Sequence, residues 1–113
     1  MVKIEGNKLG NNFAFLIPDK DIIFHRVSKL NFLGKNYSDK NSTYLQIELT
    51  FRKGDQIDKM NFKTLKDRVI SDLTKIKFID KKNDIKKFQI KSFKFAYVIY
   101  DLDHRKNVDY LLN

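Results

Sequence analysis

The sequence predicts an α+β domain, with a mixed, mostly antiparallel sheet of four to five strands and one long amphipathic helix packed on one face. Apolar and polar residues alternate over residues 43–51, which is the pattern of a half-buried strand. Apolar residues recur every three or four positions over residues 61–76, which is the pattern of a helix. The chain has 113 residues, 42% of them hydrophobic, so we expect residues 1–113 to form a single domain.

The first half of the chain predicts short strands joined by turns. Residues 2–5 are rich in β-branched side chains and end at a Gly-Asn turn signal. Residues 13–17 and 21–27 favour two strands, which a turn of about four residues beginning at Pro18 would join into a hairpin. Residues 28–42 are polar and irregular, and we expect a loop there.

The helix predicted over residues 61–76 has one apolar and one polar face. Either Asn61 or Asp58 can cap its first turn, because the side-chain oxygen accepts from a free backbone N–H. The apolar face is expected to carry Phe62, Leu65, Val69, Leu73 and Ile76. The outward face is expected to carry Lys63, Lys66, Asp67, Asp72 and Lys75.

After a charged turn, residues 88–100 predict one long strand. Apolar side chains fall on both of its faces towards the end, which is typical of a central strand covered on both sides. Residues 107–112 have the composition of a short helix.

The composition excludes several classes of site. There is no cysteine, so no disulfide, zinc–thiolate centre or thiol nucleophile can form. No apolar run is long enough to cross a membrane and residues 1–12 contain no apolar leader, so we expect a cytoplasmic protein without membrane contact. His25 and His104 have no partners at the spacing of a metal site or a catalytic triad, and the residues alone indicate no catalytic or metal-binding group.

The net charge of +9 has two interpretations. Basic residues neutralise phosphates, so the charge suits a nucleic-acid binder. The lysines, however, are spread along the chain and interleaved with acidic residues, and arginine, which favours bidentate phosphate contacts, occurs only four times. The densest lysine cluster, residues 81–87, is interrupted by Asp84. The scatter favours a solvated lysine-rich surface over a nucleic-acid footprint.

Three stretches together resemble a known family. They are IPDKDIIFHRVS at residues 17–28, LQIELTFRKGDQIDKM at residues 45–60, and FAYVIYDLD at residues 95–103 followed by KNV at residues 106–108. In this order they resemble the substrate-domain half of FAD-dependent amine oxidases, in the branch of protoporphyrinogen oxidase and UDP-galactopyranose mutase. The resemblance covers most of the chain from about residue 13 onward.

The resemblance implies an oxidoreductase, and the chain lacks the part that would bind FAD. That family carries a glycine-rich fingerprint that holds the FAD pyrophosphate, and this sequence has none. We therefore expect a substrate-domain fragment or relic that binds no cofactor and is inactive alone. It would work with a flavin-binding domain supplied in trans, or cover its exposed surface by self-association through residues 13–17 or 88–100. By resemblance, Arg26, Tyr97 and Tyr100 would line the cleft between substrate and flavin.

Two alternatives to the flavoenzyme fragment stay open. A basic binding module for nucleic acid or another polyanion would use the +9 charge. A purely structural or interaction domain would need no diagnostic residue at all.

Overall fold

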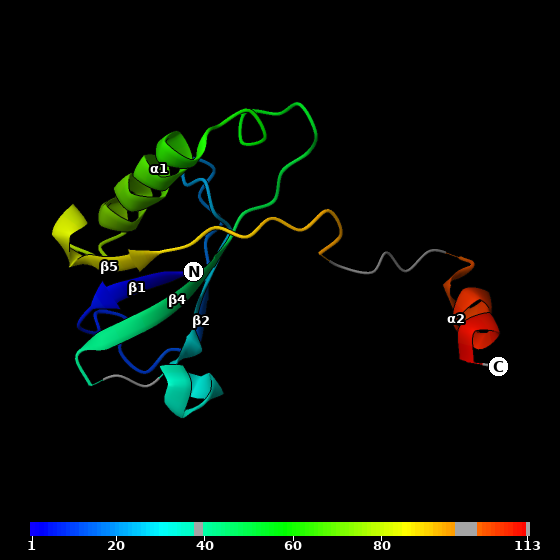
Figure 1. The fold of residues 1–113 in the computed structure, drawn as a ribbon, viewed down its shortest axis with the longest axis horizontal. Helices are drawn as coiled ribbons and strands as arrows, with labels where there is room; N and C mark the ends of the chain where they lie inside the picture. The colour runs from blue at the N-terminus through cyan, green and yellow to red at the C-terminus, as the bar shows by residue number, and fades with distance from the viewer. Residues whose placement is uncertain (38–39, 97–101, 113) are drawn as a thin grey trace.

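The computed structural model describes residues 1–37, 40–96 and 102–112 (Figure 1). Its strands are β1 (Val2–Glu5), β2 (Ala14–Leu16), β3 (Arg26–Lys29), β4 (Ser42–Glu48) and β5 (Ile85–Phe88). Its α-helices are α1 (Phe62–Lys75) and α2 (His104–Leu112), and its short 3₁₀ helices are η1 (Leu30–Leu33), η2 (Lys35–Tyr37) and η3 (Lys82–Asp84). The α+β class is therefore confirmed. The expectation of one long helix is met only in part, since two helices of 14 and nine residues are present.

The five strands form one sheet in the order β2-β3-β4-β1-β5. Every neighbouring pair is antiparallel, as the sequence predicted for most of the sheet. The strand nearest the N-terminus, β1, lies inside the sheet between β4 and β5 (Figure 1). The two edges of the sheet are therefore β2 and β5.

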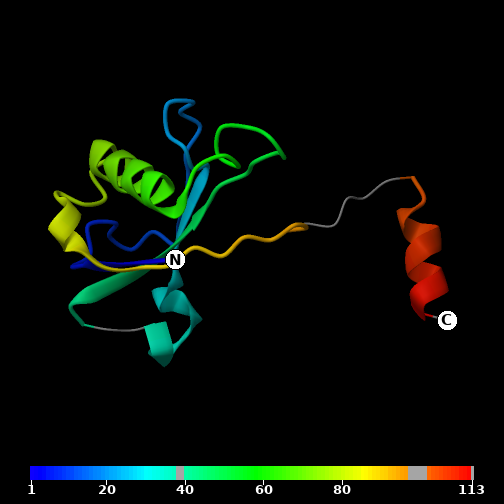
Figure 2. The same ribbon diagram turned by 45° about the horizontal axis from the view of Figure 1, so that its top comes forward.

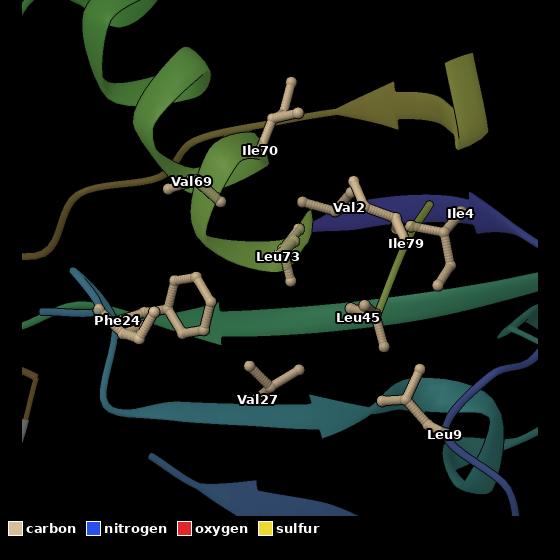
Figure 3. Packing of buried hydrophobic residues seen from close by; sticks show 11 residues of the cluster. Val2, Ile4, Leu9, Phe24, Val27, Leu45, Val69, Ile70, Leu73 and Ile79 are labelled. Carbon is tan, nitrogen blue, oxygen red and sulfur yellow. The ribbon is translucent and has the colours of Figure 1, made fainter. Parts of the chain in front are cut away.

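The core is a cluster of buried apolar side chains that come from α1, the inner strands and the loops beside them. All of its buried members are aliphatic except Phe24. Figure 3 shows Leu73 of α1 directed towards Leu45 of β4, both of which are fully buried. The buried members of the cluster are Val2, Ile4, Leu9, Ile22, Phe24, Val27, Leu45, Val69, Ile70, Leu73 and Ile79. Alternate residues of β3 and β4 point into this cluster, and the residues between them point to the opposite face.

Local hydrogen bonds define both ends of α1. The Asn61 side chain accepts from the Thr64 N–H at 2.8 Å, which confirms Asn61 as the N-cap. At the other end Lys77 adopts a left-handed conformation, with φ of 62°. This turn lets the Phe78 N–H donate to the Leu73 carbonyl at 3.0 Å and ends the helix.

Asp72 lies on the buried side of α1, so its expected place on the outward face is wrong. Only 4% of it is exposed. Its carboxylate accepts from the Ile23 N–H at 2.8 Å and from Arg68 Nε at 3.0 Å. A helical pattern assigns every charged residue to solvent, and it gives no sign of a backbone donor supplied by a distant loop.

The hairpin of residues 13–27 has a longer connection than predicted. β2 pairs with β3 as expected, but β3 begins at Arg26 and not at residue 21. Asp19 turns the chain, because its side chain accepts from the Asp21 N–H at 2.8 Å and its carbonyl from the Ile22 N–H. Ile22 and Phe24 are nevertheless buried, so their apolar character reflects the core and not a strand.

The long strand predicted over residues 88–100 is wrong for its described part. β5 ends at Phe88, and residues 89–96 have no regular structure. Met1 and Gln89 exchange two backbone hydrogen bonds, of 2.8 and 2.9 Å, at the end of the ladder between β1 and β5. No neighbouring strand is described beside residues 90–96, and β5 is an edge strand, not a central one. Residues 97–100 of the prediction lie outside the described residues.

The C-terminal helix α2 begins at His104, three residues before the expected position. None of its residues is buried. Figure 2 shows α2 apart from the sheet and α1.

Candidate functional site

The positive charge is concentrated in one part of the chain. Residues 63–94 contain eleven lysines or arginines and only four acidic residues, so they account for seven of the nine net positive charges. These residues form α1, η3, β5 and the segments next to them. In Figures 1 and 2 these elements lie together at one end of the molecule. The fold therefore produces a basic region that the even spread of lysines does not suggest.

A shallow pocket of about 410 Å³ lies in this region, between α1, η3 and β5. We call it the lysine pocket. It is lined by Lys66 and Ile70 of α1, Lys82 of η3, and Ile85 and Lys86 of β5. Lys66 and Ile70 share a side of α1 because they are four residues apart. The pocket thus combines an aliphatic floor with three ammonium groups at its rim.

Asp84 fixes the loop that carries Lys82. Its carboxylate accepts from the Asp80 N–H at 2.9 Å and from the Lys81 N–H at 3.1 Å. This carboxylate, which appears in the sequence to interrupt the densest lysine cluster, therefore binds backbone groups of the turn. Its structural role places Lys82 against α1.

Two of the three pocket lysines also form ion pairs. Lys82 Nζ is 3.6 Å from Asp67 Oδ1, and Lys86 Nζ is 3.0 Å from Glu5 Oε2. All four side chains are about half exposed or more. Ion pairs this exposed contribute little, and a multivalent anion can compete for their lysines.

Aromatic rings lie beside the third lysine. Lys66 Nζ is 5.7 Å from the centre of the Phe88 ring, a cation–π distance. Phe62 packs edge-on against Phe88, with ring centres 6.2 Å apart, and is itself 56% exposed. An exposed ring next to lysines can stack on a nucleobase while the lysines contact phosphates.

The described residues contain no cluster of metal-ligating side chains. No group of three His, Asp or Glu side chains is close enough to hold a metal ion within residues 1–37, 40–96 and 102–112. Hydrogen bonds from the Arg52 and Asp58 N–H groups lower the pKa of Asp55, and burial lowers the pKa of the Met1 amino group. Neither Asp55 nor Met1 lines the lysine pocket.

A second, smaller pocket of about 230 Å³ lies between the loops and the first half of α1. It is lined by Lys20, Ile22, Ile23, Gln56, Ile57, Met60 and Arg68. Arg68 is already occupied, since its guanidinium donates to Asp72 and to the Asp21 carbonyl at 2.6 Å. We assign this arginine a structural role in holding the loop against α1.

The residues expected to line a flavin cleft do not form a described site. Arg26 lies in β3 on the sheet face opposite the core, where its Nη1 is 3.8 Å from Glu48 Oε1. Tyr97 and Tyr100 lie outside the described residues. The sequence did not predict the lysine pocket, because its residues come from three separate elements. The signal that points to this region is the net charge of residues 63–94, which is higher than that of the rest of the chain.

Comparison with models of known protein families, with curated proteins and with solved structures found no match for this chain. The amine oxidase resemblance therefore stays a prediction. No helix in the described ranges combines the length and the apolar character needed to cross a bilayer.

Proposed function

We propose that this chain is a binding module for single-stranded nucleic acid, which contacts the lysine pocket and the rings beside it. The observation that carries the proposal is the concentration of seven net positive charges in residues 63–94, around a pocket rimmed by three lysines. Phosphate contacts by lysine release counterions and supply most of the affinity for a non-specific site.

The exposed Phe62 ring favours a single strand over a duplex. Bases in a duplex are stacked on one another and present no free face, whereas an unpaired base can stack on a protein ring. Phe62 is fixed by Phe88, and Phe88 in turn lies beside Lys66. The aromatic and cationic groups are therefore adjacent, as a nucleotide requires.

The test is fluorescence anisotropy with a labelled poly-U or poly-dT oligonucleotide over a series of salt concentrations. Changing Lys66, Lys82 and Lys86 together to Gln removes the pocket charges while keeping an unbranched polar side chain at each position. We expect the affinity to fall on the order of tenfold or more, and the slope of log K against log salt to decrease by about two, since each lost contact to a single strand accounts for about 0.7.

The matched control changes Lys35, Lys40 and Lys53 to Gln, because these three lysines are exposed and lie outside the basic region. It should bind nearly as well as the unmodified chain. An equal loss in both variants would attribute binding to net charge alone and contradict the pocket. Binding by duplex DNA as tight as by the single strand would contradict the role of Phe62.

The resemblance to FAD-dependent amine oxidases supports a second candidate, an inactive substrate-domain fragment that requires a flavin-binding domain in trans. Two of the three resembling stretches lie side by side in the sheet, where Arg26 of β3 is opposite Glu48 of β4. The chain's own residues do not fit FAD, because none of its four glycines leads into an α-helix whose N-terminus could hold the pyrophosphate. We expect no quenching of FAD fluorescence by the chain alone, and quenching by the chain alone would contradict this candidate.

A further inference from the structure

The segment after β5, residues 89–96, presents apolar side chains to solvent. We call it the arm. Phe93 is 58% exposed, Phe95 is 82% exposed and Ile90 is 42% exposed. The described contacts of the two rings are with Lys91 and Lys94 of the same segment, at 5.0 and 5.3 Å from the ring centres. The chain bends at Lys94 between the two rings, and straightening it would place both rings on one side of a strand, because side chains two residues apart share a face.

The opposite edge of the sheet is β2, which has a strand on one side only among the described residues. Within the described part of the chain β2 pairs with β3 alone, through the backbone groups of Phe13, Phe15 and Ile17. By the alternation of an antiparallel ladder, Ala14 and Leu16 direct their N–H and C=O groups away from β3. This edge is therefore open to a further strand.

The open edge also carries exposed aromatic rings on the core side of the sheet. Phe15 packs against Phe78 at 4.9 Å between ring centres, next to the core cluster. Phe13 shares its side of β2 and is 50% exposed, in edge-on contact with Phe32 at 5.6 Å. A strand added beyond β2 would place alternate side chains beside Phe13 and Phe32.

We propose that the arm of one copy adds as an extra strand to β2 of a second copy, with Phe93 and Phe95 covering Phe13 and Phe32. Each copy supplies one arm and one β2 edge, so the exchange is reciprocal and closes as a two-fold dimer. Main-chain hydrogen bonds to Ala14 and Leu16 and burial of the four rings would hold it together.

The arm cannot reach the β2 edge of its own sheet. A position beyond β2 is five strand spacings from β5, which is about 24 Å along the sheet. Gln89 is held at β5 by its bonds to Met1, and the four residues from Gln89 to Phe93 span at most about 14 Å. A second copy faces no such restriction.

The exposed aromatic area is sufficient for a dimer. With about 200 Å² for a whole phenylalanine side chain, Phe13, Phe32, Phe93 and Phe95 of both copies would bury on the order of 1,000 Å². A stable interface buries about 1,600 Å² in total, and the backbone of the two arms can supply the remainder.

Sedimentation equilibrium over a concentration series is the first test. The unmodified chain should pass from monomer to dimer as its concentration rises. Changing Phe93 and Phe95 to Ser should weaken the dimer at least tenfold. The same change at Leu111 and Leu112 of α2, which are each 80% exposed, should leave the dimer intact. A monomer at every concentration would overturn the proposal, and so would a dimer that survives the arm substitutions.

Cross-linking identifies the surface, because the chain contains no cysteine of its own. Ser92→Cys marks the arm and Ala14→Cys marks the open edge, on the face opposite the rings. A mixture of the two single-cysteine proteins, treated with a short bismaleimide, should give a 14–92 heterodimer. Lys53→Cys in place of Ala14→Cys should give none. A chain with both cysteines that cross-links only within itself, at any dilution, would show that the arm folds onto its own sheet and would overturn the proposal.

Discussion

At the scale of single residues, the most informative side chain is one that the helical pattern misplaced. Asp72 is 4% exposed and joins α1 to the loop before β3 through the Ile23 N–H and Arg68. The buried carboxylate of Asp72 is stable in this position because the Ile23 N–H and the Arg68 guanidinium both donate hydrogen bonds to it. The sequence shows the helix and the loop separately, and it contains no signal of the hydrogen bond between them.

Asp72→Ala should lower the free energy of unfolding by about 1–3 kcal/mol, because the partly buried Ile23 N–H would lose its acceptor. Urea denaturation followed by circular dichroism measures this. Asp67→Ala on the same helix removes an exposed carboxylate and should change stability by less than about 0.5 kcal/mol. Equal losses in the two variants would show that the charge of α1 matters and the hydrogen bond to the loop does not.

The structure of the loop around Asp55 should depend on pH. Its pKa is lowered below the ordinary value of 3.8 because the charged carboxylate accepts from the Arg52 and Asp58 N–H groups. Its contribution to the loop is therefore complete above pH 3.8 and is lost as the pH falls through the lower, folded-state pKa. Amide resonances of Arg52 and Asp58 should shift together in that range, and Asp55→Asn should remove the shared transition.

At the scale of elements, prediction succeeded where local chemistry decides the structure and failed where a distant partner does. α1 carries its own cap and its own apolar stripe, so its bounds agree with the prediction within a residue at each end. Residues 89–96 have the composition of a strand, yet a strand also requires a neighbour, and composition cannot supply one.

The N-cap of α1 provides a direct test of local control. Asn61→Ala should destabilise the protein by about 1 kcal/mol, because the Thr64 N–H would lose its side-chain acceptor. Asn61→Ser keeps an acceptor at that position and should remain within a few tenths of a kcal/mol of the original. Thermal unfolding measures both, and a loss in Asn61→Ser as large as in Asn61→Ala would contradict the capping role.

At the scale of the whole molecule, two properties depend on how the elements are arranged in space. The net charge gathers in residues 63–94 of the sequence, and folding brings the elements of that segment together at one end, because α1, η3 and β5 are neighbours in space. The molecule is also extended, with a radius of gyration of 16.9 Å. A compact domain of this length would have about 13 Å. The excess reflects α2, which lies apart from the sheet (Figure 2).

The position of β1 has a consequence for how this protein is made. Its two neighbours are β4, at residues 42–48, and β5, at residues 85–88, so β1 is translated long before one of the two strands that flank it. At roughly 5–20 residues per second, translation of the intervening chain takes several seconds. Val2 and Ile4 are buried in the complete sheet, and during that time they lack β5 as a neighbouring strand. The ladder between β1 and β5, and with it the full burial of Val2 and Ile4, can therefore form only after residue 88 has been translated.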